Sequence, residues 1–282
     1  MGMRMTDRMQ TIIECAEEEA AKTDKQTVSI LHLLIAFLKQ DASFLAELSY
    51  WSSISIEELR CVDNNVQTFD YRQMSSPYFS IPVEKDVTIV FASAIGYMQK
   101  FNQIYLNEGH LLKALLRTDQ VDKLLTDDDK FMMISLGATA RDMITHLGNY
   151  SFPNIPSSFG IRRVYHTDRN KLVSFVYDHF SREWSLTIER AFVEGKDTIY
   201  VATDSQRNYV GFAAFDIFQN KKNYFGPMGV KLDLRGNGIG FGLLHHCLRD
   251  MKEIGYEYAI LGGAGPIEFY EKACKAVIIP IF

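Results

Sequence analysis

Apolar residues recur at helical spacing through the first half of the chain. Near the N-terminus these positions are Met9, Ile12, Ile13, Ala16 and Ala20. Residues three and four positions apart lie on one side of a helix, so these side chains form a single apolar stripe. The acidic run 17–19 falls mostly on the opposite side and is expected to face water. The pattern predicts an amphipathic helix packed against a core.

Part of this half is repeated. The segment SILHLLIAFLKQD begins at Ser29 and NEGHLLKALLRTD begins at Asn107, so that His32 and His110 occupy matching positions 78 residues apart. Ser29 and Asn107 have side chains that accept a hydrogen bond from a free amide at the start of a helix. We therefore expect both to cap helices. We expect the histidines to hydrogen-bond within their repeat rather than to act in catalysis or bind a metal.

Each copy is longer than this motif. An amphipathic segment precedes it at 4–22 and at 83–100, and a second match follows it, ISIEELR around Arg60 and ISLGATARDMI around Arg141. The sequence thus predicts an all-α domain at residues 1–148, a four-helix unit used twice.

This double repeat resembles the N-terminal domain of Clp chaperones, whose repeats carry a motif of the form TEHLLLALL. The family's threonine and glutamate are replaced here by Ile30 and Leu31 in one copy and by Glu108 and Gly109 in the other. In the family, this domain receives substrates and adaptor proteins for an attached ATP-driven unfoldase. The present chain has no GxxxxGKS or GxxxxGKT loop for a nucleotide. The resemblance therefore implies a domain that binds a protein partner.

The second half alternates strand-like and helix-like segments. IRRVYH is strand-like, 170–180 and 184–194 are helix-like, and three strand-like segments follow, TIYVATD, YVGFAAFDIF and NYFGPMGVKLD. A helix to about residue 254, a strand YAILGG, a short helix PIEFYEKA and a strand KAVIIP complete the order. We expect an α/β domain with a mixed sheet at residues 161–282. The segment NYSFPNIPSSFG, at 149–160, interrupts both patterns and is predicted to be a linker.

A glycine-rich stretch separates NYFGPMGVKLD from the next helix. A dinucleotide fingerprint GxGxxG fails there, because its last glycine would fall on Phe241 or Leu243, and the lysine of a P-loop is absent. The pattern that fits is R-x-x-G-x-G, formed by Arg235, Gly236, Asn237, Gly238, Ile239 and Gly240. Such a turn offers a pyrophosphate free amides and the positive end of a helix, and glycines permit a close approach. The alternative is a turn whose glycines, including Gly242, only permit tight packing.

This loop resembles the acetyl-coenzyme A loop of the GNAT superfamily of acetyltransferases, and the resemblance extends from about residue 161 to the end. Met228, Gly229 and Val230 match the family's fourth strand, which parts from its neighbour and offers backbone groups to the pantetheine arm. PIEFYEKA is similar to the family's LYEK segment, so the resemblance implies that Tyr270 is the general acid toward the departing thiolate. It also implies acetyl-CoA as co-substrate and direct attack by an amine on the thioester, with the carbonyl polarised by a backbone amide around Val230.

The sequence departs from the family in three places. Seven residues before the tyrosine the family often has an asparagine that contacts the cofactor, and this chain has Gly263. The glycine usual after YEK is displaced by residues 273–275, and the chain ends at Phe282, where the family continues into a seventh strand. We expect either that the sheet is completed from elsewhere, for example by a second copy of the chain in a homodimer, or that it is incomplete and activity is lost.

The base and the acceptor have no signature. Candidates for the base are Asp216, Glu183 and Glu189, with water relays as an alternative. The aromatic residues on the first two helices are Tyr177, Phe180, Trp184 and Phe192, which indicate either a partly apolar acceptor pocket or core packing. The acceptor amine belongs to a small molecule or a protein. His245 and His246 are expected to be surface or packing residues, and Cys247 and Cys274 core residues. The alternative to an enzyme is an adaptor or coenzyme A-binding protein that acts through the Clp-like half.

Composition excludes several classes of function. The net charge of −5 is too acidic for general nucleic-acid binding. The four cysteines include no CxxC pair, so we expect no metal site and a reducing, cytoplasmic environment. No run of about 18 apolar residues predicts a membrane span, and the start lacks the apolar run of a signal peptide.

Overall fold

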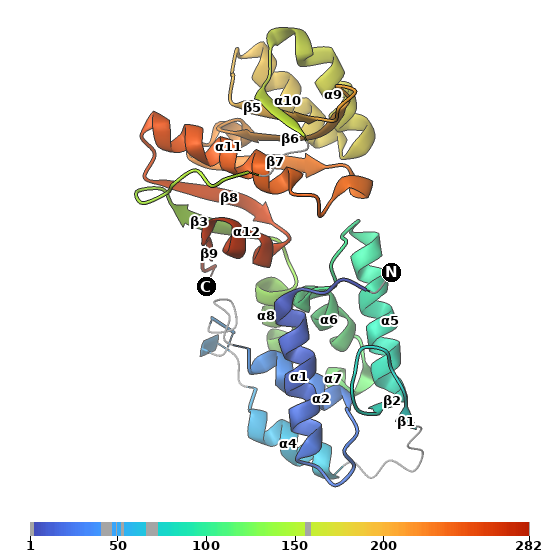
Figure 1. Ribbon diagram of the computed structural model, residues 1–282. Helices are drawn as coiled ribbons and strands as arrows, with labels where there is room; N and C mark the ends of the chain where they lie inside the picture. Colours follow the sequence, from blue (N-terminus) through green and yellow to red (C-terminus); the bar gives the residue numbers. More distant parts are fainter. Residues whose placement is uncertain are drawn as a thin grey trace. The chain divides into compact units, whose positions relative to one another are not determined.

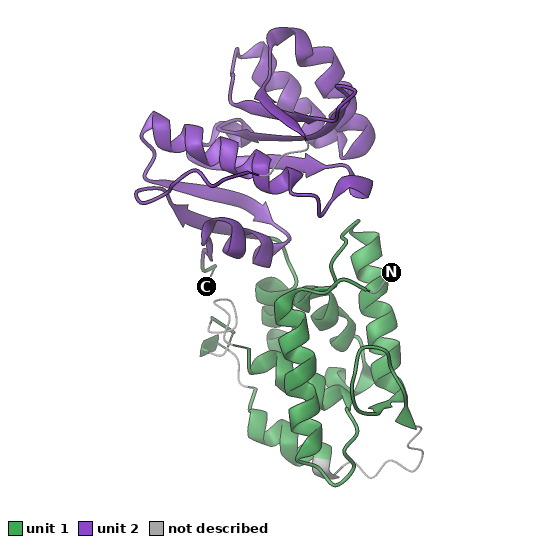
Figure 2. Ribbon diagram, viewed as in Figure 1, with its two compact units in different colours: residues 1–140, 280–282 green, residues 141–279 purple. Residues whose placement is uncertain are grey.

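The chain divides into two compact units, which we describe separately (Figure 2). The computed structural model describes residues 3–40, 47–48, 50–51, 54–65, 73–155 and 159–281. Unit 1 comprises residues 1–140 and 280–282, and unit 2 comprises residues 141–279. The predicted order of an all-α domain followed by an α/β domain is confirmed.

Unit 1 is an assembly of short helices around one buried helix. The helices are α1 (Asp7–Ala21), α2 (Ile30–Leu38), α4 (Ile56–Asn65), α5 (Lys85–Lys100), α6 (Glu108–Leu115), α7 (Asp119–Leu124) and α8 (Asp127–Gly137) (Figure 1). Strands β1 (Gln73–Met74) and β2 (Val83–Glu84) form a small antiparallel pair. Every residue of α2 from Ile30 to Phe37 is buried, as expected for a helix that is apolar on all sides.

The two repeats are tied together where their helices begin. Met5, just before α1, forms a parallel bridge with Leu106, just before α6. Val28, just before α2, forms the matching bridge with Val83, just before α5. The first helix of each repeat therefore begins beside the second helix of the other, which is the reciprocal arrangement expected of a duplicated unit.

The predicted helix caps are confirmed. Ser29 Oγ accepts a hydrogen bond from the amide of His32 at 3.2 Å, and Asn107 Oδ1 accepts one from the amide of His110 at 3.1 Å. Each imidazole in turn accepts, through Nδ1, the amide hydrogen of its cap residue, at 3.1 Å and 3.2 Å. The two histidines thus take the place of the glutamate in a capping box. These contacts give them a structural task within their own repeat.

The expectation that residues 17–19 mostly face water is wrong for Glu19. Its side chain is only 2% exposed, and it forms ion pairs with Lys22 (2.8 Å), Lys39 (3.0 Å) and Arg60 (2.9 Å). Hydrogen bonds from Arg60 hold the pKa of Glu19 far below its usual range, although burial opposes them. On helix α1, Glu19 lies on the same side as Ala16 and Ala20, which are also buried. The apolar spacing along α1 gives no information about the three cations that pair with Glu19.

Unit 2 is built on one sheet of seven strands in the order β4-β5-β6-β7-β8-β3-β9. The strands are β3 (Arg141–His146), β4 (Gly160–Arg163), β5 (Ile199–Thr203), β6 (Tyr209–Phe215), β7 (Tyr224–Val230), β8 (Tyr258–Ala264) and β9 (Val277–Ile278). Only the β7–β8 pair is parallel. The antiparallel neighbours expected in the middle of the domain are therefore present.

Helices cover both faces of this sheet (Figure 1). They are α9 (Arg169–His179), α10 (Arg182–Val193), α11 (Ile239–Ile254) and α12 (Ile267–Cys274), with 3-10 turns η1 (His166–Asp168), η2 (Phe218–Asn220) and η3 (Leu232–Leu234). Ile199 and Val201 of β5 belong to the core under α9 and α10, whereas Tyr200 between them contacts His246 of α11. Because successive strand residues point to opposite faces, α11 covers the face opposite α9 and α10.

The boundary between the units differs from the predicted one. The segment around Arg141, expected to be the last helix of the second repeat, is strand β3, and the division falls at residues 140 and 141 rather than at 148. β3 lies between β8 and β9 and is antiparallel to both. Its buried positions are Arg141, Met143 and Thr145, which gives the period of two that is typical of a strand. The sheet thus receives an interior strand from the residues before the predicted linker, and this pairing needs no second chain.

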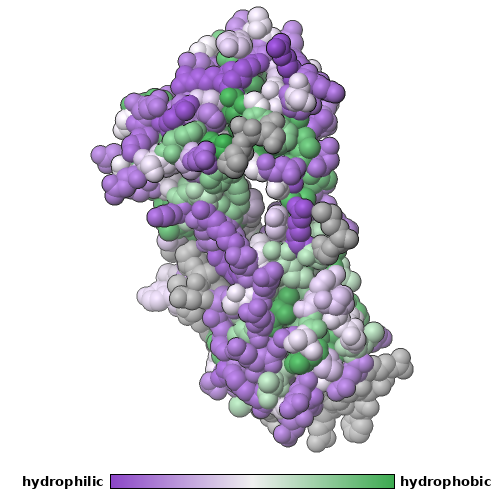
Figure 3. All heavy atoms as spheres, viewed as in Figure 1, coloured by the Kyte–Doolittle hydropathy of each residue, from purple (hydrophilic) through white to green (hydrophobic). Residues whose placement is uncertain are grey.

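The surface of both units is mixed. On the face drawn in Figure 3, hydrophilic residues cover most of each unit, with smaller hydrophobic patches between them. Within the described ranges, no helix has both the length and the apolar character needed to cross a membrane. The same residues contain no group of three or more potential metal ligands of the His, Cys, Asp and Glu types.

Candidate active site

Strands β7 and β8 part soon after they begin. Their pairing is restricted to Tyr224 with Ile260 and Phe225 with Leu261. On the other edge of β7, the amide of Lys231 donates to the carbonyl of Val210 at 2.9 Å. Amide directions alternate along a strand, so the amides of Met228 and Val230 point away from β6, toward the edge that β8 has left. This edge of β7 offers backbone donors that no strand pairs.

The glycine loop leads from β7 into α11 without a side-chain cap. After η3 the chain passes through Gly236 (φ 86°) and Gly238 (φ 80°), and Gly238 is the N-cap residue of α11. Positive φ angles of this size strain any residue with a β-carbon, which explains a glycine at both positions. No side chain bonds the first amides of α11, and the positive end of its helix dipole lies there. An anion is suited to this end of the helix.

Arg235 holds the loop to β7 rather than extending from it. Its Nε donates to the carbonyl of Val230 at 3.0 Å, and burial lowers the pKa of its guanidinium. Asn237 Nδ2 donates to the carbonyl of Leu234 at 3.1 Å, inside the same turn. The two polar side chains of the predicted loop therefore fix its shape, and the backbone remains as the main donor to a ligand.

The glycines at the start of α11 have different surroundings. A β-carbon at Gly240 would make only ordinary contacts, 3.7 Å to Val230 Cγ2 and 3.9 Å to Met228 Cε. A β-carbon at Gly242 would lie 2.5 Å from Ile161 Cδ1 of β4. An alanine at residue 242 would thus require the end of the Ile161 side chain to move, whereas one at residue 240 would meet only ordinary contacts with the described residues. Met228, Val230 and Gly240 converge on the α11 face of β7.

Tyr270 lies at the point where β7 and β8 part. Its ring meets the ring of Phe225, the last paired residue of β7, edge to face at a centroid distance of 6.4 Å. The side chain is buried, burial raises its pKa above the usual value, and no described residue hydrogen-bonds its hydroxyl. Tyr270 is therefore protonated at neutral pH and able to donate.

The proposed bases are held by other side chains or lie on the surface. Asp216 lies beside Tyr224, at the end of β7 away from the glycine loop, where its Oδ2 accepts hydrogen bonds from Tyr256 (2.6 Å) and Lys222 (3.3 Å). Glu189 is paired with Arg169 at 3.0 Å, and Glu183 is exposed on the first turn of α10. His245 and Cys247 are buried packing residues of α11, while Cys274 and His246 are partly buried.

One residue near the parted strands was missed in the sequence. Asp142 of β3 accepts hydrogen bonds at Oδ1 from the amide of Gly263 (2.8 Å) and from the Tyr224 hydroxyl (3.1 Å). Burial and this carboxylate raise the pKa of Tyr224 to about 12. Asp142 thus connects β3, β7 and the end of β8, where Gly263 has replaced the family's asparagine. Apolar alternation gave no signal for this strand, because two of its three buried positions are Arg141 and Thr145.

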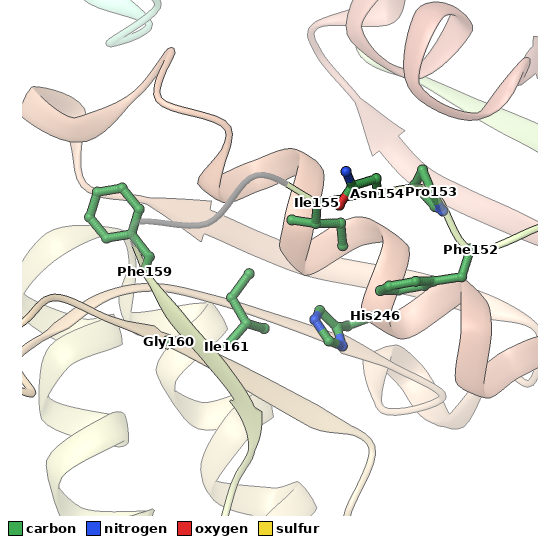
Figure 4. Close-up of a pocket in the computed structure, with 8 residues that line it drawn as sticks. All are labelled: Phe152, Pro153, Asn154, Ile155, Phe159, Gly160, Ile161 and His246. Atoms are coloured by element: carbon green, nitrogen blue, oxygen red, sulfur yellow. The ribbon is translucent and has the colours of Figure 1, made fainter.

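A pocket of about 540 Å³ lies elsewhere in unit 2. Figure 4 shows its lining, which consists of Phe152, Pro153, Asn154, Ile155, Phe159, Gly160, Ile161 and His246. None of these residues belongs to the glycine loop, to β7 or to α12. The pocket is therefore separate from the candidate active site.

Each half of the chain matches a known protein family. Residues 4–127 match the Clp repeat N-terminal domain family, and residues 163–275 match the acetyltransferase (GNAT) family. No curated protein matches the chain.

Solved structures resemble each half separately. A GCN5-related glucosamine N-acetyltransferase region of a fungal β-N-acetylglucosaminidase is 16% identical, with a TM-score of 0.43, over 56% of this chain and 22% of that one. The N-terminal domain of ClpD from Arabidopsis thaliana is 21% identical, with a TM-score of 0.38, over 47% and 93%. A GNAT-family enzyme from Escherichia coli in complex with CoA is 22% identical, with a TM-score of 0.31, over 38% and 63%. The chain therefore joins a domain similar to the Clp repeat N-terminal domain to a domain similar to the GNAT acetyltransferases.

Proposed function

We propose that unit 2 is an acetyl-CoA-dependent N-acetyltransferase. The observation that supports this most directly is the uncapped start of α11, preceded by Gly236 and Gly238 at positive φ and lying beside the open edge of β7. Amides from Gly236 to Gly240 would bind the pyrophosphate of coenzyme A, and Met228, Gly229 and Val230 would lie along its pantetheine arm. A bulky anionic thioester fits these features better than a free phosphate, because the open edge continues from the loop toward Tyr270.

In this reaction the amine attacks the thioester carbonyl, a C–N bond forms and the C–S bond breaks. The amide of Val230 would polarise the carbonyl oxygen, and the Tyr270 hydroxyl would give its proton to the departing thiolate. The attacking ammonium group must first lose a proton. Since Asp216 and Glu189 are engaged elsewhere, we assign this step to water at the open edge of the site.

The test is a thiol-release assay with acetyl-CoA and a panel of amines and peptides, together with calorimetric binding of CoA. Tyr270→Phe is expected to lower kcat by about 10²–10⁴-fold, while CoA binding stays within about twofold, because the phenyl ring keeps its contact with Phe225. Unchanged thiol release in this variant would show that the hydroxyl is not the general acid and that the ring has a packing role instead. An unmodified chain that binds no CoA would exclude the proposed activity.

The alternative is a coenzyme A-binding or adaptor protein without turnover. The burial of the Tyr270 side chain is the observation that favours it, because a general acid must reach the thiolate. CoA binding without thiol release on any acceptor would identify this case. In both cases we propose that unit 1 binds a protein, either the acceptor or a partner.

A further inference from the structure

The acceptor must approach β7 from the side that the cofactor loop leaves free. Met228 and Val230 point toward Gly240 on the α11 face, and the intervening Gly229 points to the opposite face, as its pairing with the buried Phe212 under α9 and α10 requires. If coenzyme A enters along α11, the amine reaches the thioester from the α9 and α10 side.

That side of β7 is covered by Phe180. A β-carbon at Gly229 would lie 2.5 Å from Phe180 Cε1 and 2.7 Å from its Cζ, so the ring occupies the space that a side chain at residue 229 would take. Phe180 directly follows α9, at the turn into α10. Because residue 229 is a glycine, the Phe180 ring can pack directly against β7 at this position.

Trp184 extends the aromatic surface. Its ring stacks on Phe180 with centroids 6.0 Å apart, and both rings meet Phe212 edge to face, at 5.4 Å and 6.1 Å. Phe212 is buried, but Phe180 and Trp184 remain partly exposed. Of the other two aromatic residues singled out in the sequence, Phe192 is core and Tyr177 is exposed. Phe180 and Trp184 thus present an uncharged aromatic wall next to Gly229.

The charges around the two rings are of both signs, since Asp178 and Glu183 are exposed and Arg182 lies between Phe180 and Trp184 in the sequence. The partly buried carboxylates of this region are already paired, Asp168 with Arg162 at 2.6 Å and Glu189 with Arg169 at 3.0 Å. An aromatic wall contributes by burial of apolar surface and, for an ammonium group, by cation–π attraction.

We propose that Phe180 and Trp184 bind the carbon skeleton of the acceptor, and that the acceptor is a primary amine carried on an aromatic or bulky apolar group. This inference rests on the proposed acetyl transfer and names its substrate class. The amine then lies at the open edge of β7, with its apolar group against the exposed parts of the two rings. A free arylalkylamine and a polypeptide with an apolar N-terminal residue share this chemistry.

The experiment uses the full chain and matched acceptors. Thiol release is measured with 2-phenylethylamine, ethanolamine and spermidine, and with two peptides that begin with Phe or Gly. We expect kcat/KM for 2-phenylethylamine or the Phe peptide to exceed that of its polar partner by about tenfold or more. Whether the free amines or the peptides show the larger preference for the apolar acceptor tells whether the acceptor is a small molecule or a polypeptide. The ratio of kcat/KM for the apolar acceptor to kcat/KM for its polar partner should fall close to one in Phe180→Ala. Tyr177→Ala, on the exposed side of α9, should leave this ratio unchanged.

Binding gives a second readout that needs no turnover. The chain has two tryptophans, so Trp51→Phe leaves Trp184 as the only one. The aromatic amine should change its fluorescence at concentrations at which spermidine does not. If Phe180→Ala does not fold, Phe180→Leu replaces it and should lower the ratio without abolishing it. Equal or better turnover of spermidine, a ratio unaffected at residue 180, or unchanged Trp184 fluorescence would each overturn the inference. Failure of the proposed function is distinct, because it appears as absence of CoA binding.

Discussion

Most helices of unit 1 begin at a side-chain cap, whereas α11 of unit 2 begins at a glycine. The contrast concerns α11 rather than the whole unit, because α5 of unit 1 lacks a cap hydrogen bond and Ser181 caps α10 of unit 2. In unit 1 the caps of α1, α2, α6, α7 and α8 are Thr6, Ser29, Asn107, Thr118 and Thr126, and each side chain accepts an amide hydrogen of its helix. In unit 2 the cap of α11 is Gly238, which has no side chain to offer. Capped amides are satisfied within the fold, while those of α11 are left for water or a ligand. What distinguishes α11 from the other helices without a cap hydrogen bond, α5, α9 and α12, is the pair of glycines at positive φ before it, and this supports the binding role proposed for the loop.

The largest expected effect tests whether unit 2 depends on residues before the predicted linker. A fragment that begins at residue 149 lacks β3, so β8 and β9 lose their shared neighbour, and the buried Met143 is removed. We expect this fragment to show no cooperative thermal transition by circular dichroism, whereas one that begins at residue 139 should unfold cooperatively. If both fragments melt alike, β3 is dispensable, and the boundary predicted at residue 148 would be the better one.

The sequence could not easily predict β3. Two of its three buried positions are Arg141 and Thr145, which hides the period of two that apolar residues would have shown. Arg141 is buried because its guanidinium donates to the carbonyl of Ile279 at 2.8 Å, a partner near the other end of the chain. The match between the two repeats predicted a helix at this segment. It is a strand because it pairs with β8 and β9, which are distant in the sequence.

The next effect concerns the buried charge of unit 1. Glu19→Gln removes the carboxylate that three cations share. The cations themselves stay partly exposed, so we expect a loss of about 1–3 kcal/mol, the range for a buried group that loses charged hydrogen bonds. Glu18→Gln, on the exposed side of the same helix, should cost less than about 0.5 kcal/mol. Denaturant unfolding of the two variants measures both values. Similar losses for the two would show that the cations do not depend on Glu19.

The same carboxylate predicts acid sensitivity. The pKa of Glu19 is lower in the folded chain than its usual 4.5. Its contribution to the free energy of unfolding is therefore complete above pH 4.5 and declines as the pH falls below that value. Unfolding free energies measured between pH 7 and pH 3 should show this decline in the parent chain, and a smaller decline in Glu19→Gln.

The glycine loop can be tested by two neighbouring substitutions. Gly240→Ala makes only ordinary contacts in the protein, and should leave stability unchanged or raise it by up to about 1 kcal/mol. If the loop holds a pyrophosphate, the added methyl group should weaken CoA binding by about tenfold or more, measured by calorimetry. Gly242→Ala requires the end of the Ile161 side chain to move and should therefore be less stable than Gly240→Ala, by about 1 kcal/mol. Unchanged CoA binding in Gly240→Ala would favour the packing role that the sequence left open.

The loop residues themselves were predictable because their task is local. Glycines at 236 and 238 follow from the turn, and their spacing is visible in the chain. The roles of Arg235 and Asp142 were not visible, since the first bonds back to Val230 and the second reaches Gly263 from a strand that precedes it by more than a hundred residues. The spacing of residues in the sequence predicts structure within a segment. Contacts between segments far apart in the chain become visible only in the folded structure.

The smallest effect compares the two caps within unit 1. Asn107→Ala removes one cap and should cost about 1 kcal/mol. Ser29→Ala should cost more, because Ser29 Oγ also donates to Asp63 at 2.7 Å, and Asp63 contacts His32 Nε2 at 3.1 Å. His110 has no described carboxylate partner, and burial lowers its pKa to about 4. Chemical unfolding of the two variants should therefore rank Ser29→Ala as the less stable. Equal costs would mean that the bond to Asp63 adds nothing beyond the cap. A larger cost for Asn107→Ala would mean that the bond from its Nδ2 to Gln103 (3.1 Å) contributes more than the bond to Asp63.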